Sequence, residues 1–366
     1  MQRFLALASA GFLSASIAQA GGIDRSGQVI APLFEPGGES GSYAELSFGS
    51  VYPSVTGTAQ GFDSGDMAEQ YLRFGAAYKT DINDRLSFAI IFDQPYGADV
   101  DYPTGTGYAF AGSTASFDSN AITGILRYKF DNGFSVHAGL RAQETSAEVS
   151  IPYLAGYQAS SPSDVGFGYL VGAAYERPEI ALRVALTYFS KIEHDTEATE
   201  YTALTGTTTS PTSFETPQAV NLDLQTGIAE DTLLFGSVRW VNWSDFTLTP
   251  PVYTNLIGLP ILYYNGDYTT YTIGVGRKFN DNWSGSIALS YEPSNGGYTT
   301  NLGPHDGLFG VLVGVKYTQD RWSVSGGVNF SWIGDAESVV SRTPFETSSF
   351  TDNTAIGAGI RIGYNF

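Results

Sequence analysis

The chain has 366 residues and carries 37 Asp and Glu against 18 Lys and Arg, so its formal net charge is −19. Such an acidic protein lacks the clustered basic residues that a nucleic-acid partner needs, and we expect none. The absence of cysteine excludes disulfides and thiolate metal sites, and we expect neither a metal ion nor a cofactor. The 43 Gly, 23 Tyr and 23 Phe favour many strands, separated by turns and bordered by aromatic side chains.

The N-terminus has the pattern of a secretory signal. Arg3 precedes a short apolar stretch from Phe4 to Ile17, and Ala18-Gln19-Ala20 has the small-x-small form of a cleavage site. The stretch is shorter than the roughly 20 apolar residues that a transmembrane helix needs. We therefore predict a signal peptide at residues 1–20, removed after Ala20.

Residues 21–42 show no strand pattern and mix Gly, Pro and apolar residues. We predict that they form a hatch, a short plug inside a barrel, with Ile30, Pro32, Leu33 and Phe34 as its apolar contacts. A loose N-terminal arm is the alternative.

From residue 43 onward, successive segments alternate apolar and polar residues, which gives each strand one apolar and one polar face. Fourteen segments can be delimited, and single-chain bacterial barrels have even strand numbers. The segments lie at 43–57, 66–80, 85–99, 115–130, 133–150, 162–177, 180–193, 212–230, 231–248, 265–280, 281–293, 308–318, 321–338 and 351–366.

The connections between these segments alternate in length. Compact turns such as Asp131-Asn132-Gly133 and Asn280-Asp281-Asn282 follow the even-numbered segments, and longer loops, among them the polar Glu197–Ser213, follow the odd-numbered ones. Short turns on one side and long loops on the other are typical of outer-membrane barrels. We predict an all-β, 14-stranded antiparallel transmembrane β-barrel over residues 43–366. A soluble or extracellular all-β repeat protein is the alternative.

The last strand ends on an aromatic residue. Ile360, Ile362, Tyr364 and Phe366 alternate with Arg361, Gly363 and Asn365, so the apolar set should face lipid. A closed barrel exposes no free strand edge, so this strand should pair with the first one. A terminal Phe is similar to the insertion signal of bacterial outer-membrane barrels, which implies the barrel-assembly machinery as a partner.

Seven cations stand between apolar neighbours within the predicted strands. A cation on the lipid face costs ~2–4 kcal/mol near the midplane, so we predict that all seven point into the lumen. They are Arg73, Arg127, Arg141, Arg183, Arg239, Lys316 and Arg361.

Two roles for these cations remain open. They can pair with inward carboxylates, for which Glu45, Glu69, Glu144 and Asp223 are candidates, and brace the barrel. Alternatively, one or two bind the anionic head of a ligand, because a guanidinium matches both oxygens of a carboxylate.

Two further segments are candidate sites. The loop at residues 250–264 is strongly apolar, and it either packs on its own barrel mouth or binds an apolar ligand through Ile257, Leu259, Ile261, Leu262 and Tyr263. Pro95, Tyr96 and Gly97 interrupt the third strand, because Pro cannot donate to the ladder and Gly adds no packing. They mark either the end of that strand or a kink that opens the wall toward lipid.

Four stretches resemble the FadL family (OMPP1/FadL/TodX) of outer-membrane transporters for long-chain fatty acids and aromatic hydrocarbons. They are Leu86–Gly97 ending in Pro-Tyr-Gly, Trp240–Phe246 with its Trp-x-x-Trp-Ser-x-Phe pattern, Tyr291–Ser294 with Leu302–Asp306, and Phe34–Pro36 through Val51–Gly57. The resemblance implies a luminal hatch, a kinked third strand and ligand exit sideways through the wall. The chain departs from the family at the hatch, which is short and has Ile30-Ala31-Pro32 where members carry Asn-Pro-Ala.

We therefore expect a monomeric outer-membrane channel for passive uptake of hydrophobic small molecules, surrounded by outer-membrane lipid. Fatty acids and aromatic hydrocarbons both remain possible ligands. A general porin for polar solutes and an adhesive or structural barrel are the alternatives. We do not expect an enzyme, since the three histidines, His137, His194 and His305, form no recognisable nucleophile arrangement even where Ser135 lies near.

Overall fold

The computed structural model describes residues 22–342 and 345–366, so the predicted signal peptide at 1–20 lies outside the described residues. In chain order the elements are η1 (Ala31–Phe34), β1 (Ser42–Ser54), β2 (Gly57–Ala59), β3 (Phe62–Asp63), β4 (Tyr71–Asp81), β5 (Leu86–Asp93), β6 (Gly97–Asp101), β7 (Thr114–Lys129), β8 (Phe134–Ile151), β9 (Tyr157–Arg177), η2 (Pro178–Ile180), β10 (Leu182–Phe189), β11 (Ile192–Thr202), β12 (Gly206–Thr216), β13 (Ala219–Ala229), β14 (Thr232–Val241), η3 (Trp243–Asp245), β15 (Thr247–Leu248), α2 (Pro251–Ile257), β16 (Leu262–Tyr263), β17 (Tyr268–Lys278), β18 (Trp283–Glu292), β19 (Tyr298–Thr299), β20 (Leu308–Gln319), β21 (Trp322–Ile333), β22 (Ala336–Arg342), β23 (Phe345–Phe350) and β24 (Thr354–Asn365).

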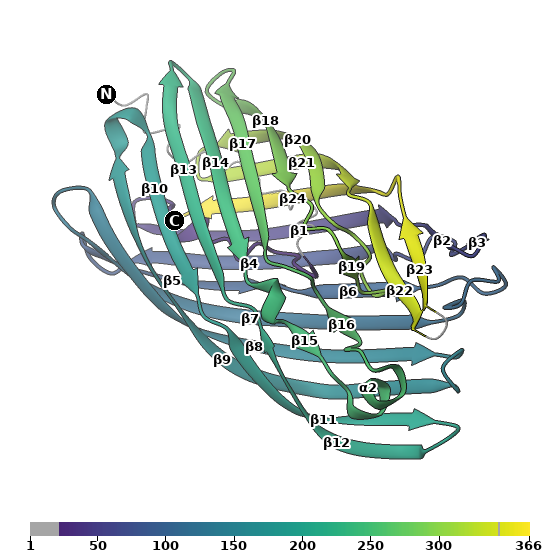
Figure 1. Cartoon of the computed structure of the whole chain (residues 1–366). Coiled ribbons are helices and arrows are strands. Elements are labelled where there is room, and N and C mark those ends of the chain that lie inside the picture. The colour runs from purple at the N-terminus through teal and green to yellow at the C-terminus, as the bar shows by residue number, and fades with distance from the viewer. Residues whose placement is uncertain (1–21, 343–344) are drawn as a thin grey trace.

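The main sheet closes on itself as an antiparallel barrel. Its sheet has 17 strands, but in three places two consecutive strands are the interrupted halves of one wall strand. These places are β5 with β6, β10 with β11, and β12 with β13, so the wall has fourteen strands. The first strand, β1, pairs with β4 on one side and with the last strand, β24, on the other. The predicted 14-stranded barrel is confirmed. Small elements, including α2 and the β22–β23 hairpin, gather at the end opposite the C-terminus (Figure 1).

Closure at the last strand follows the predicted register. Leu46 of β1 stands opposite Ile362 of β24, and the Phe366 N–H donates to the Ser42 carbonyl at 3.0 Å. The side chains of Ile360 and Phe366 are each 43% exposed on the outer face. The apolar face of the terminal strand therefore points away from the lumen, as its alternation predicts.

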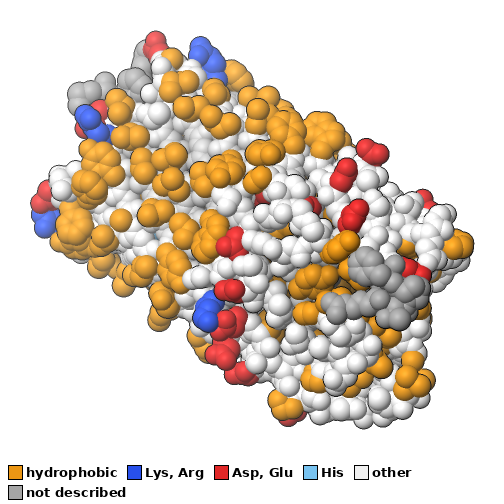
Figure 2. Space-filling view, viewed as in Figure 1, with side chains coloured by type: hydrophobic (Ala, Val, Ile, Leu, Met, Phe, Trp, Pro, Cys, Tyr) orange, Lys and Arg blue, Asp and Glu red, His pale blue; other side chains and the backbone are white. Residues whose placement is uncertain are grey.

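Side-chain alternation separates the two faces of the wall. Leu140 is 76% exposed, whereas its neighbour Arg141 is 4% exposed, and the same contrast holds for Leu126 and Arg127. Hydrophobic side chains cover the outer face of the half of the barrel that holds the C-terminus, and the other half is mostly polar with scattered acidic residues (Figure 2). Among the described residues no helix is both long and apolar enough to span a membrane.

The prediction of a polar loop at Glu197–Ser213 is wrong. These residues belong to a long hairpin in which β11 pairs with β12 from Ile192↔Thr216 to Thr202↔Gly206. Thr and Ser occupy both faces here, so the apolar/polar alternation that marks a lipid-facing strand is missing, although β-branched Thr favours strand. The apolar segment at 250–264 also contains regular structure, namely α2 and the short strand β16.

Candidate functional site

The segment before β1 lies against inward-facing side chains of the wall. Ile30, Pro32, Leu33 and Phe34, the four predicted hatch residues, are all buried. The Phe34 ring lies 4.5 Å from the Arg127 guanidinium and 4.9 Å from that of Arg183, measured to the ring centroid. Each contact is a cation–π interaction, which strengthens where water is excluded. The segment is therefore packed onto the barrel interior from residue 23 to residue 35.

Glu35 follows Phe34 and is buried with it. Burial raises the pKa of its carboxyl group, and the nearby Lys316 partly offsets that rise. Lys316, one of the seven predicted luminal cations, therefore interacts with the N-terminal segment rather than with open lumen.

Five other predicted cations are held by side chains inside the barrel. Arg127 forms an ion pair with Glu176, Arg141 with Asp93 at 3.2 Å, Arg239 with Asp24 at 2.6 Å, and Arg361 with Glu45 at 3.6 Å, while Arg183 lies over Phe34. Glu45 is one of the carboxylates expected to brace the interior, and the other three pairs use carboxylates that the strand pattern did not single out.

Arg73 differs from the four cations that form ion pairs. Among the described residues it forms no salt bridge, and its Nε atom is buried without a hydrogen-bond partner. The Arg73 side chain projects from β4, two residues from the start of that strand.

The wall is interrupted beside Arg73. The ladder between β4 and β5 runs from Asp81↔Ser87 to Ala76↔Phe92 and stops there. Beyond it, among the described residues, Tyr71–Gly75 have no ladder partner on β5 or β6. The two edges meet again at the isolated bridge Ala68↔Val100. We call this unpaired stretch, Tyr71–Gly75 facing Gln94–Ala98, the wall break.

The predicted kink residues form one edge of the wall break. Pro95 and Tyr96 fall between β5, which ends at Asp93, and β6, which begins at Gly97. Both β5 and β6 pair with β7, so the wall strand continues beyond the interruption at Pro95 and Tyr96. A kink that opens the wall toward lipid stays a prediction.

The N-terminal segment takes the place of β4 at the kink. Asp24 forms an antiparallel bridge with Tyr96, the Arg25 N–H donates to the Pro95 carbonyl at 2.7 Å, and the Gly97 N–H donates to the Ile23 carbonyl at 2.9 Å. Backbone groups left unpaired by the break are thereby satisfied, as buried backbone requires.

Arg25 lies across the wall break. Its Nη2 donates to Asp99 Oδ2 at 2.6 Å, and its guanidinium lies 4.0 Å from the Tyr71 ring centroid. Asp99 belongs to β6 and Tyr71 to β4, so this side chain contacts both edges. Gly97 makes room for it, because a Cβ there would overlap the guanidinium.

The apolar loop lines a cavity at the mouth of the barrel. Ile257, Leu259, Ile261 and Tyr263 all line this mouth cavity of about 360 Å³. Leu262, the fifth predicted contact, lies deeper and lines the next cavity together with Ile261. The loop therefore both packs on its own barrel and leaves apolar surface facing a space.

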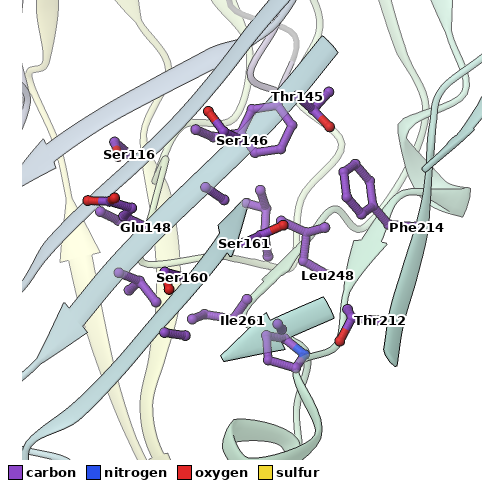
Figure 3. Close-up of a pocket in the computed structure, with 18 of the residues that line it drawn as sticks. Ser116, Thr145, Ser146, Glu148, Ser160, Ser161, Thr212, Phe214, Leu248 and Ile261 are labelled. Atoms are coloured by element: carbon purple, nitrogen blue, oxygen red, sulfur yellow. The ribbon is translucent and has the colours of Figure 1, made fainter. Parts of the chain in front are cut away.

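A smaller cavity of about 80 Å³, the apolar cavity, adjoins the mouth cavity and shares Ile261 and Leu302 with it. Figure 3 shows Thr145 and Phe214 on its upper side and Leu248 and Ile261 on its lower side. Its other apolar lining residues include Ala98, Phe117, Ala147, Leu262 and Leu302.

A third cavity of about 140 Å³, the wall cavity, contacts Arg25, Tyr71 and Gly97 at the wall break. It shares Ala98 and Leu302 with neighbouring cavities: Ala98 lines the apolar and wall cavities, and Leu302 lines all three. The three spaces thus adjoin one another between the mouth and the break.

His305 also lines the wall cavity. Burial lowers the pKa of its imidazole to about 4, so the ring is neutral near pH 7. The charges at this cavity therefore come from Asp24, Arg25, Glu69 and Asp99.

Helix α2, above the mouth cavity, is held by a buried carboxylate. Glu200 of β11 is 0% exposed and accepts the N–H groups of Val252 and Tyr253, both at 3.0 Å. The Tyr157 hydroxyl donates to the same carboxylate at 2.9 Å. These bonds satisfy free N–H groups of the first helical turn and fix the helix over the cavity.

The histidine nearest to a serine in the sequence does not activate it. His137 Nε2 lies 2.9 Å from Thr187 Oγ1, and Ser135 Oγ accepts from Arg127 Nε at 3.0 Å. These contacts brace the wall and leave Ser135 without a base.

Comparison with known proteins identifies the family. Residues 43–302 match the family model described as outer membrane protein transport protein (OMPP1/FadL/TodX). The chain belongs to this family. Its members are outer-membrane β-barrel transporters of hydrophobic compounds, which places this OMPP1/FadL/TodX member in the outer membrane.

Solved structures share its fold over nearly the whole chain. A FadL homologue from Pseudomonas aeruginosa superposes with a TM-score of 0.77 at 16% identity and 98% coverage of each chain. The toluene transporter TodX of Pseudomonas putida gives 0.66 at 16% identity, covering 97% of this chain and 98% of its own. The toluene transporter TbuX of Ralstonia pickettii gives 0.63 at 13% identity, covering 96% and 97%. None of the curated proteins compared with this family member is significantly similar to it in sequence.

Three residues of the site had no sequence signal. Arg25 and Asp24 lie in a segment without periodicity, and Glu200 lies in the Thr-rich stretch interpreted as a loop. The sequence shows only that these three residues are charged and stand in polar or apolar segments. Charge alone does not predict which group each residue contacts.

Proposed function

We propose that this OMPP1/FadL/TodX member passes hydrophobic small molecules from the mouth cavity through the apolar cavity to the wall break, where they leave for the membrane. The observation that carries the proposal is that three cavities adjoin one another and share the lining residues Ile261, Leu302 and Ala98. Apolar walls suffice for binding, because burying each CH₂ contributes ~0.8 kcal/mol. No covalent step or energy source is part of the proposal.

The packed N-terminal segment supports exit through the wall. It occupies the lumen side with Leu33 at 0% exposure and Phe34 held between two guanidinium groups. A ligand coming from the mouth meets this segment before it reaches the turn end of the barrel. At the wall break, residues 23–25 and their side chains lie between the ligand and β4. We propose that displacement of these residues opens the route.

Growth and uptake measurements test this function. A deletion strain of the source bacterium, with and without the gene restored, is compared for uptake of labelled dodecanoate and labelled toluene. We expect uptake of at least one of them to fall on deletion and to recover with the restored gene; normal uptake of both would refute the function. Rapid sugar flux through the purified protein in liposomes would point to a porin instead.

A further inference from the structure

The wall lacks ladder pairing at a second place, between β9 and β11. The ladder of β9 with β10 ends at Leu170↔Phe189, and pairing returns only where β9 meets β11 at Ser160↔Thr199. Among the described residues, 161–168 and 191–198 form no ladder pair with each other. We call these two facing stretches the seam. The strands β7 and β8 separate it from the kinked wall strand β5–β6.

The sequence of β9 explains why the ladder stops. Pro162 has no N–H group and cannot donate to a ladder. Beside it, Ser146 of β8 stands opposite two residues of β9, Pro162 and Ser163, because the register between the two strands shifts there. A bulge of this kind bends its strand and increases the local twist. The bend takes β9 out of register with β11 over the seam.

Two side-chain contacts join the strands across the seam. Ser161 Oγ donates to Thr196 Oγ1 at 3.1 Å, and His194 Nδ1 lies 3.0 Å from Asp164 Oδ2. A ladder is a continuous row of backbone hydrogen bonds, whereas these two contacts can break one at a time. The seam therefore separates more easily than the laddered parts of the wall.

The lower part of the seam is filled by one aliphatic side chain. Gly166 and Gly168 of β9 leave space on the luminal side, and Ile192 of β11 occupies it. A Cβ on Gly166 would lie 2.5 Å from Ile192 Cγ2, and a Cβ on Gly168 would lie 2.6 Å from Ile192 Cγ1. Ile192 is 2% exposed, so its side chain closes this part of the seam.

The seam lies between the apolar cavity and the outer face of the barrel. On the inner side, Ser161, which is labelled in Figure 3, and Thr196 both line the apolar cavity. On the outer side, Val165 and Phe167 of β9 are 51% and 77% exposed, as lipid-facing side chains are. The two residues that bond across the seam are thus part of the cavity wall.

The outer face of β11 beside the seam is acidic. Glu193, Asp195 and Glu197 are exposed there, and Lys191 next to them forms an ion pair with Glu215 at 2.7 Å. An excess of negative charge repels anions from this part of the wall. Uncharged molecules meet no such barrier.

We propose that the seam is a second lateral port, through which uncharged apolar molecules pass between the apolar cavity and the membrane. The inference rests on the proposed function and adds a route that needs no displacement of residues 23–25. Passage requires the two side-chain contacts to break and Ile192 to move aside. Apolar surface is present on both sides of the seam to receive the ligand.

A reversible cross-link tests the port, because the chain has no cysteine of its own. In the double variant Ser161→Cys with Thr196→Cys, the two sulfur atoms replace hydroxyl oxygens that lie 3.1 Å apart, so a disulfide can form and lock the seam. Uptake of labelled toluene into proteoliposomes is measured before and after oxidation. It should fall about twofold on oxidation, because two routes with similar barriers carry similar fluxes, and it should recover on reduction.

The matched control is Ala173→Cys with Leu186→Cys, a pair that stands directly opposite in the ladder of β9 with β10. Its disulfide should leave toluene uptake unchanged. Equal uptake by the oxidised and reduced seam variant, or an equal fall in the control, would overturn the port. If the seam disulfide does not form, Asp164→Ala is measured instead: faster toluene uptake supports the port, and an unchanged rate refutes it.

The same measurements separate the port from the proposed function. A wild-type protein that takes up no toluene refutes the channel function itself. A protein that takes up toluene equally well with its seam locked refutes the port alone.

Discussion

Replacing Arg25 by Gln should loosen the N-terminal segment in the wall break. The substitution removes the hydrogen bond from Arg25 to Asp99 and the contact with the Tyr71 ring, while the backbone bonds to Pro95 and from Gly97 remain. A hydrogen bond to a charged group contributes ~1.5–3 kcal/mol net, and an exposed cation–π contact ~0.5–1 kcal/mol. The side chains of Arg25 and Asp99 are 10% and 27% exposed, so water weakens both contacts. We therefore assign the two contacts together about 2 kcal/mol, the lower limit of the sum of the two ranges.

If displacement of the N-terminal segment limits ligand passage, the lost stabilisation lowers the barrier and raises the rate of passage. A change of about 2 kcal/mol in the barrier corresponds to roughly 30-fold faster passage. Uptake of labelled toluene into proteoliposomes measures it, because toluene carries no charge that could itself contact Arg25. The maximal rate should rise and the half-saturating concentration should stay constant, since the mouth cavity is unchanged.

Two further variants make the result decisive. Asp99→Asn removes the acceptor charge and should accelerate uptake in the same direction. Arg321→Gln is the control, because Arg321 pairs with Glu39 at 3.4 Å where both side chains are exposed, and such pairs contribute little. If Arg25→Gln transports toluene at the wild-type rate, as the control should, the argument that Arg25 holds the break closed is refuted.

The remaining predictions concern the same path. Gly97→Ala places a methyl group where the Arg25 guanidinium lies, so it should reproduce the faster toluene uptake of Arg25→Gln; an unchanged rate would show that Arg25 relocates freely. Glu200→Gln replaces an acceptor-only carboxylate with an amide whose NH₂ opposes the N–H donors of α2, so hydrogen exchange in residues 251–257 should become about tenfold faster or more, and equal exchange would contradict the anchoring role. Phe34→Ala removes the ring between Arg127 and Arg183 and should raise ion conductance in planar bilayers, whereas wild-type conductance would show that this contact does not keep the lumen closed.

The wall of this barrel could be predicted because the facing of each side chain depends on its neighbours along the strand. Alternation in a strand decides which side chain faces lipid, and a cation such as Arg141 beside Leu140 can only point inward. The terminal strand around Ile362 was predictable for the same reason. The same rule failed for the hairpin around Glu200, since above the lipid both faces are polar and no alternation is required.

The partners of the inward cations could not be predicted. Seven basic residues on the luminal face are equivalent in the sequence, yet four of them form ion pairs with carboxylates, Arg183 lies over the Phe34 ring, and Arg73 forms no salt bridge among the described residues. Arg73 is left over because Asp24 and Asp93 are taken by Arg239 and Arg141, which lie on other strands.

The sequence by itself thus determined a closed outer-membrane barrel, its lipid face, its inward charges and the interruption at Pro95. Only the tertiary structure decided that residues 23–25 fill that interruption and that Arg25 contacts Asp99, 74 residues away. The physical reason is one of range. Alternation and turn chemistry act between neighbours along the chain, whereas the closing of the wall break depends on groups that meet only when the barrel encloses its own N-terminus.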